Sequence, residues 1–375
     1  MKKRGFILIC VLAICLLFCV RTSAEETQMP DEYRDFLDSL PEGAENVLPE
    51  NFYSDKFDSV TDSVEQMSGM EYLTSLLLQS LGRGFSDVFP HVILLISLVI
   101  LSALGNMAFA HISPSGNKIY EICSHIVLFC AIGGVAVEVL SDVKVFFSEL
   151  NVSMAAFVPL SATLYTMGGN INAAVSSSTG LLFSLGVIQF ISGVVVMPLF
   201  CFCLCTSFIS SISGDIIGGG IGEGVKKAFM TTLTVITAIL GLSLSSQTII
   251  SSKADNLAMR GARIFAGNIP VSGGIVSSSI GTIASSVELI RSVVGVGGII
   301  VILWLLLPVF LQLWIIRTLY SLLGSVSGAL GQSGQQRLFC EISELYGILE
   351  GVVIMCSLVF VLGMAILCRT APAMR

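Results

Sequence analysis

The stretch Asn151–Gly214 contains 64 consecutive residues without a single Asp, Glu, Lys or Arg. Such a run cannot supply the surface of a soluble domain. Because one bilayer crossing needs about 20 apolar residues, it is long enough for two membrane helices. The rest of the chain agrees, since only 12% of the 375 residues are charged and 54% are hydrophobic, against about 25% charged in soluble domains. The sequence therefore predicts an all-α, polytopic membrane protein.

The amino terminus has the layout of a secretory signal. Three basic residues at 2–4 precede the apolar run 5–20, and small residues occupy the −3 and −1 positions if cleavage follows Ala24. We expect a cleaved signal peptide over residues 1–24. The alternatives are an uncleaved anchor and a lipoprotein modified at Cys19, although the bulky Phe18 before this cysteine disfavours the lipoprotein.

The negative charge of the chain is confined to one segment. Residues 25–87 contain 15 acidic and 3 basic residues, whereas residues 88–375 contain 11 acidic and 12 basic residues. Apolar residues recur at helical spacing within the acidic segment, namely Tyr53, Phe57, Val60, Val64 and Met67. We therefore expect an exported, acidic helical segment at 25–87 and a multi-pass membrane domain at 88–375. The acidic segment is either a solvated cap or a docking surface for an extracytoplasmic partner.

Uncharged runs predict about seven passes after the signal peptide. They are Val88–Ala110, Ile119–Leu140, two passes within Asn151–Gly214, Ala228–Ser252, Ser292–Ile316 and Gly351–Cys368. With the acidic segment exported, this count puts residues 111–118 and 253–291 and the C-terminal tail in the cytoplasm, and residues 141–151 and 214–227 outside. The net charges of these connections follow the positive-inside rule except at Lys226 and Lys227. One or three passes within Asn151–Gly214 would invert everything downstream.

Two segments interrupt apolar stretches with a proline followed by paired glycines. The candidate residues for a helix break or passage are Pro159, Gly168, Gly169, Pro270, Gly273 and Gly274. Proline removes a backbone donor and glycine permits unusual backbone shapes. Within hydrocarbon, such irregular backbone must be buried in protein or line a wet cavity, as in the broken helices of transporters. The alternative is a pair of ordinary turns at the membrane surface.

An amphipathic segment is expected at 253–294. Lys253, Arg260 and Arg263 would share one helix face as a candidate basic face. Further on, Val276–Val294 carries a narrow apolar seam opposite a face rich in hydroxyl groups. This helix either lies flat on the lipid headgroups or packs on other helices with its polar face along an aqueous path.

Features of enzymes, metal sites and nucleic-acid-binding proteins are not found in the sequence. The glycine-rich run Gly218–Lys227 lacks the Gly-Lys-Ser/Thr of a phosphate loop. The three histidines are isolated, and the eleven cysteines, mostly in apolar runs, are best explained as packing residues. A net charge of −7 gives no nucleic-acid footprint. We expect no enzymatic activity, no cofactor and no nucleic-acid partner.

Small residues at four-residue spacing, such as Gly324 and Gly328, allow membrane helices to approach closely. They predict dense internal packing or self-association within the lipid bilayer.

Several long blocks resemble the stage III sporulation protein AE family. They are KADNLAMRGARIFAGNIPVSGG at Lys253–Gly274, SSVELIRSVVGVGGIIVILW at Ser285–Trp304, AAFVPLSATLYTMGGN at Ala155–Asn170 and TVITAILGLSLSSQ at Thr234–Gln247. The resemblance covers most of the chain from about residue 85 onward. It implies a multi-pass protein of the mother-cell membrane around the forespore. It also implies a multiprotein conduit with ring-forming and ATPase subunits and a partner in the forespore membrane. No catalytic residues are implied by the family.

On this basis we expect a membrane subunit of a secretion-like channel complex that links mother cell and forespore and is required for forespore development during sporulation. A self-sufficient small-molecule permease is the alternative, because it would share the broken helices. An intramembrane enzyme is the second rival, and the absence of any paired acid–base or metal cluster in the sequence argues against it.

Overall fold

The computed structural model describes residues 30–41, 44, 48–54, 57–110, 114–167, 171–213, 224, 227–229, 231, 232, 235 and 273–369. Within these residues the regular elements are all helical. The elements are α2 (Asp31–Asp38), η2 (Glu50–Tyr53), α3 (Phe57–Ser68), α4 (Met70–Ala110), α5 (Pro114–Met167), α6 (Ile171–Phe190), the π-helical turn η3 (Ile191–Val196), α7 (Met197–Ser213), α9 (Gly273–Ala329) and α10 (Ser333–Arg369). The predicted all-α class is confirmed. The signal peptide expected at 1–24 lies outside the described residues.

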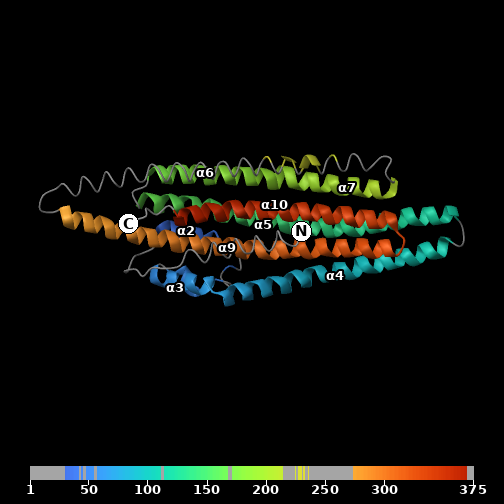
Figure 1. Cartoon of the computed structure of the whole chain (residues 1–375), viewed down its shortest axis with the longest axis horizontal. Helices are drawn as coiled ribbons and strands as arrows, with labels where there is room; N and C mark the ends of the chain where they lie inside the picture. Colours follow the sequence, from blue (N-terminus) through green and yellow to red (C-terminus); the bar gives the residue numbers. More distant parts are fainter. Residues whose placement is uncertain are drawn as a thin grey trace.

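The long helices run side by side in an elongated bundle (Figure 1). At its centre α9 and α10 form an antiparallel hairpin, packed on α4 and α5 on one side and on α7 on the other. The hairpin turns at Gly331, whose φ of 77° lies in the left-handed region that glycine adopts readily. The N–H of Gln332 donates to the carbonyl of Ser327 across this turn, which closes the end of α9.

Small residues allow the two arms of this hairpin to approach closely. A Cβ atom added to Gly324 would lie 3.1 Å from the sulfur of Cys340, and one added to Gly328 would lie 2.7 Å from the Gln336 side chain. This close contact is the internal packing expected from the four-residue glycine spacing. Self-association stays a prediction.

The longest helices exceed the thickness of a membrane. α5 has 54 residues and is therefore about 80 Å long, against a hydrocarbon core of about 30 Å. Among the described residues, five helical stretches are long and apolar enough to cross a membrane: Val88–Phe109, Gly116–Met167, Ala174–Ile212, Val293–Ala329 and Ser333–Ala365. The count of seven stays a prediction, and most of the run Ala228–Ser252 lies outside the described residues.

The prediction of a connection between two helices at 141–151 is wrong, because these residues lie within α5. Four apolar side chains there, Val143, Phe146, Phe147 and Leu150, are buried. Their spacing of 3, 1 and 3 gives one helical face against the core. The segment contains neither proline nor glycine, so nothing in it stops the helix that enters from the preceding apolar run.

The ends of the helices also differ from the expected topology. α5 reaches its far end at Met167, and Ile171–Ser213 returns to the starting end in one traverse of the bundle (Figure 1). The end of α7 therefore lies at the same end as the α4–α5 connection, whereas the expected topology put residues 111–118 and 214–227 on opposite sides. α10 ends at Arg369 at the other end of the bundle.

The described part of the acidic segment packs on the long apolar helices rather than standing apart. The ring of Phe36 on α2 meets that of Phe157 on α5 with centroids 5.8 Å apart, and Thr163 donates a 2.9 Å hydrogen bond to Glu32. The hydroxyl of Tyr33 donates to the carbonyl of Phe52, and burial raises the pKa of Tyr33 above its usual value. α4 also continues without a break from residue 87 to residue 88, so the proposed boundary at this point falls inside one helix.

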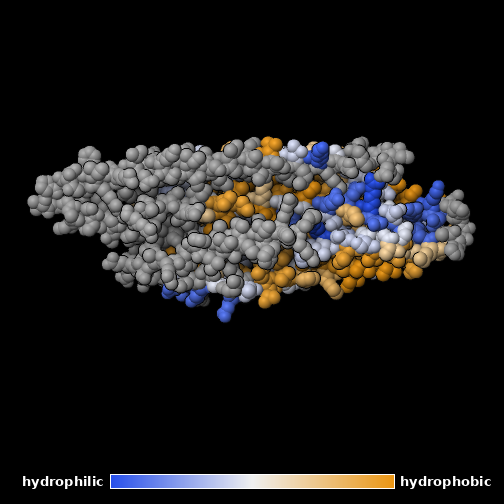
Figure 2. All heavy atoms as spheres, in the orientation of Figure 1, coloured by the Kyte–Doolittle hydropathy of each residue, from blue (hydrophilic) through white to orange (hydrophobic). Residues whose placement is uncertain are grey.

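The outer surface carries a long apolar zone, seen along α4 in Figure 2. On α4 it includes the exposed side chains of Phe89, Ile93, Leu101, Leu104 and Met107. A soluble monomer rarely exposes a contiguous patch of this kind, so this face suits contact with lipid.

Candidate functional site

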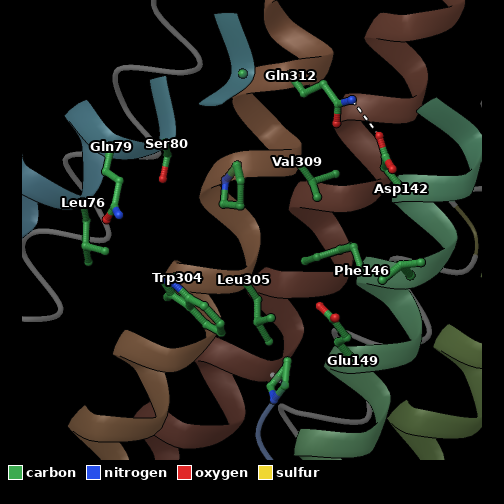
Figure 3. Close-up of a pocket in the computed structure, with 14 residues that line it drawn as sticks. Leu76, Gln79, Ser80, Asp142, Phe146, Glu149, Trp304, Leu305, Val309 and Gln312 are labelled. Atoms are coloured by element: carbon green, nitrogen blue, oxygen red, sulfur yellow. Dashed lines mark hydrogen bonds between the residues drawn. The ribbon is translucent and has the colours of Figure 1, made fainter. Parts of the chain in front are cut away.

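A cavity of about 330 Å³ lies between α4, α5 and α9. It is lined by Leu76, Gln79, Ser80 and Gly84 of α4, by Asp142, Val145, Phe146 and Glu149 of α5, by Trp304, Leu305, Pro308, Val309 and Gln312 of α9, and by Pro41 (Figure 3). Pro41 belongs to the acidic segment, so this segment and the membrane helices build the cavity together. Because Gln79 and Val145 are exposed, the cavity is open to the outside of the bundle.

The carboxylates of the site come from one face of α5. Glu138, Asp142 and Glu149 are separated by four and seven residues, a spacing that places them along one stripe of a helix. Asp142 and Glu149 line the cavity, while Glu138 lines a small adjoining hollow with His91. Ionisable side chains on apolar helices are functional candidates by default.

Gln312 joins these two hollows, because it lines both of them. Its Nε2 donates a 2.7 Å hydrogen bond to Oδ2 of Asp142. In the smaller hollow, Nε2 of His91 lies 2.8 Å from Oε2 of Glu138. One turn of α5 therefore links a His–Glu pair to the Asp–Gln pair at the upper end of the cavity in Figure 3.

A second polar contact lies between α9 and α10. Nη1 of Arg317 lies 2.7 Å from Oε2 of Glu350, and the two side chains are 25% and 11% exposed. The guanidinium passes over Gly347, where an added Cβ would lie 2.8 Å from its central carbon. Charges shielded from water to this degree need their partners, so this pair fixes the register of the hairpin.

A third polar cluster lies near the α9–α10 turn. The Gln335 side chain is fully buried, and its Nε2 donates a 2.6 Å hydrogen bond to the hydroxyl of Ser102 on α4. Ser102 in turn donates to Ser124 on α5. Interhelical hydrogen bonds between small polar residues hold membrane helices together, and here they join α10 to the α4–α5 pair.

The first proline–glycine segment is only partly described by the structure. Pro159 lies on the exposed side of α5, which continues to Met167, so the interruption comes after Met167 rather than at the proline. Gly168 and Gly169 lie outside the described residues, between the end of α5 and the start of α6 at Ile171. Their role in a passage stays a prediction.

The basic face and most of the second proline–glycine segment precede α9 in the sequence, and only the paired glycines fall within the described residues. α9 begins at Gly273 and includes Gly274. The described residues do not include Pro270 or the candidate basic face, Lys253, Arg260 and Arg263. The helix expected at Val276–Val294 is confirmed as the first part of α9, and Ile290 and Val294 at the end of its seam are buried in the bundle.

The sequence does not predict the cavity between α4, α5 and α9. Two of its carboxylates, Asp142 and Glu149, belong to the stretch 141–151 that hydropathy marks as a solvent-exposed connection. The stripe of acids at four- and seven-residue spacing was the available signal. Within the described residues, no group of three or more His, Cys, Asp or Glu side chains is placed to hold a metal ion.

Comparison with known protein families identifies the family of this chain. A family model, stage III sporulation protein AE, matches residues 56–371. The chain belongs to this family. The match begins in the acidic segment and covers every long helix of the bundle, so the helical body and part of the acidic segment are family features.

Membership in the stage III sporulation protein AE family confirms the resemblance seen in the sequence and gives the protein a role in stage III of sporulation. Its apolar helices suit a multi-pass membrane protein. No curated protein and no solved structure matches the chain at a significant level.

Proposed function

We propose that the protein is a non-enzymatic membrane subunit of a multiprotein, secretion-like channel that links mother cell and forespore during stage III of sporulation. The observation that carries the proposal is the family match over residues 56–371. In this proposal the protein lies in the mother-cell membrane around the forespore. Ring-forming and ATPase subunits and a forespore membrane protein are its partners.

The architecture supports a structural role in such an assembly. The bundle is held by interhelical polar contacts at several levels, namely Gln335 with Ser102, Arg317 with Glu350, and Gln312 with Asp142. The exported segment is fixed to the far end of the same bundle through Phe36 and Phe157. A rigid rod with an acidic outer segment can present that segment at a defined distance from the membrane to partner subunits.

Purification of the intact complex from sporulating cells tests the proposal. A tagged full-length chain, extracted in mild detergent, should bring down the ring-forming and ATPase subunits and the forespore membrane protein. A test variant, Phe36→Asp, should detach α2 from α5. It should reduce recovery of extracytoplasmic partners while the protein still accumulates. Recovery of the chain without any other sporulation protein would contradict the proposal.

The cavity between α4, α5 and α9 favours a second candidate, a self-sufficient permease. Largely apolar cavities with a few polar groups at fixed positions are the usual form of small-molecule sites. Purified protein in liposomes decides between the two functions. Transport of a solute by the protein alone would support the permease and exclude a purely structural subunit.

A further inference from the structure

The cavity between α4, α5 and α9 has a carboxylate at each end. Asp142 and Glu149 lie seven residues apart on α5, which corresponds to about 10 Å along the helix axis. Figure 3 shows Asp142 beside Gln312 at one end and Glu149 near Leu305 at the other, with Phe146 between them. The two acids therefore do not converge on one point, as the ligands of a single metal ion would.

The charge of the cavity is negative. Its described lining contains Asp142 and Glu149 and no lysine, arginine or histidine. Asp142 accepts one hydrogen bond from Gln312, a neutral donor that orients the carboxylate without neutralising it. Within the described part of the chain, the Glu149 carboxylate has no hydrogen-bond or ion-pair partner, although this side chain is half-buried. A half-buried carboxylate is stabilised by a cation.

The middle of the cavity is apolar. Val145, Phe146 and Val309 line it, Leu305 lies beside Glu149, and the indole of Trp304 adds an aromatic face, while Gln79 and Ser80 of α4 contribute neutral polar groups to the wall. Apolar walls gain free energy by covering methylene groups, and an aromatic face attracts an ammonium group. The lining thus alternates from anionic to apolar to anionic along the axis of α5.

We propose that this cavity binds a linear aliphatic diammonium compound, with one ammonium at Asp142, the other at Glu149, and the methylene chain against Phe146 and Val309. An anion is excluded by the charge of the lining, and a monoammonium compound would leave one carboxylate without a partner. The proposal goes beyond the channel-subunit function and does not depend on it.

Tryptophan fluorescence provides a direct binding signal. The chain has two tryptophans, Trp304 in the cavity and Trp314 outside it. Trp314→Phe therefore leaves Trp304 as the only reporter. The full-length chain in phosphatidylcholine nanodiscs is titrated with α,ω-diamines of four to ten carbons, and with the amino alcohol of each length as a singly charged control. We expect an optimum chain length at which the diamine binds at least tenfold more tightly than the amino alcohol.

Single neutral substitutions then assign the two ends. Asp142→Asn and Glu149→Gln should each reduce diamine affinity at least tenfold and abolish the advantage over the amino alcohol. Glu121→Gln is the matched control, because it removes an exposed acid of the same helix outside the cavity and should leave the affinity unchanged. Should a variant fail to fold, the length series on the parent protein still decides.

Three results would overturn the proposal. The first is equal affinity for diamine and amino alcohol at every length, and the second is full diamine affinity in Glu149→Gln. The third is a fluorescence response to phosphatidylethanolamine in the nanodisc without any response to diamines, which would assign the cavity to a lipid headgroup.

Discussion

Gln312 on α9 donates a hydrogen bond of 2.7 Å from Nε2 to Oδ2 of Asp142 on α5, across 170 residues of sequence. The bond joins two helices that are far apart in the sequence, and it fixes the Asp142 carboxylate at one end of the cavity. The donor is a neutral amide bonded to one carboxylate oxygen, so the second oxygen of Asp142 is left for another partner.

Gln312→Leu should loosen this junction. Hydrogen bonds to charged groups contribute about 1.5–3 kcal/mol, and because Asp142 keeps some solvent contact we expect a loss of about 1–2 kcal/mol. Denaturant unfolding of the protein in detergent, followed by circular dichroism, measures it. Gln189→Leu on the exposed side of α6 is the control and should change the unfolding free energy little. Equal effects of the two variants would show that the bond contributes no stability.

Arg317→Met should destabilise the α9–α10 hairpin more strongly. The substitution leaves Glu350, which is 8% exposed overall, without the guanidinium at 2.7 Å. Removing one partner of a buried pair costs about 3–5 kcal/mol. The double variant Arg317→Met with Glu350→Leu removes both charges and should recover most of the lost unfolding free energy. A double variant as unstable as the single one would mean that the charge left behind is not the cause.

The sequence predicted the helical class well because its signal is compositional. An uncharged run of 64 residues has few alternatives in a membrane, and the Gly168–Gly169 signal falls where α5 gives way to α6. The seam at Val276–Val294 was likewise readable, because its apolar period of 3.6 residues is a local property.

The topology and the cavity were not predictable in the same way. Residues 141–151 carry Asp142, Lys144 and Glu149, and hydropathy alone marks such a stretch as a connection. A helix of about 80 Å reaches beyond the bilayer and can keep these charges without ending. The cavity is formed by residues from three helices that are far apart in sequence, and no local pattern specifies their contacts.

Gly347→Ala tests the close passage of Arg317 over α10. An added methyl would lie 2.8 Å from the guanidinium carbon, so the guanidinium must shift, which disturbs its 2.7 Å contact with Glu350. Gly351→Ala lies one turn later, with open space around the added methyl. In a helix interior, alanine is favoured over glycine by about 0.5–1 kcal/mol. We therefore expect Gly351→Ala to be neutral or stabilising and Gly347→Ala to be destabilising, by the same unfolding measurement. Stabilisation by both would contradict the predicted clash.

Site-directed labelling tests which helix ends share a side of the membrane. Gln335 contacts Ser102 at 2.6 Å, so the α9–α10 turn lies at the same end as the α4–α5 connection, while Thr166 lies at the other end, near α2. In a background without cysteine, Lys118→Cys and Ser333→Cys should react with an impermeant thiol reagent only after permeabilisation. Thr166→Cys should react in intact cells. These three side chains are exposed in the bundle. Protection of a cysteine from the reagent therefore shows that the membrane separates them, and not that the side chain is buried in the protein. Labelling of Ser333→Cys in intact cells while Lys118→Cys stays protected would contradict the shared end, because Lys118 and Ser333 would then lie on opposite sides of the membrane.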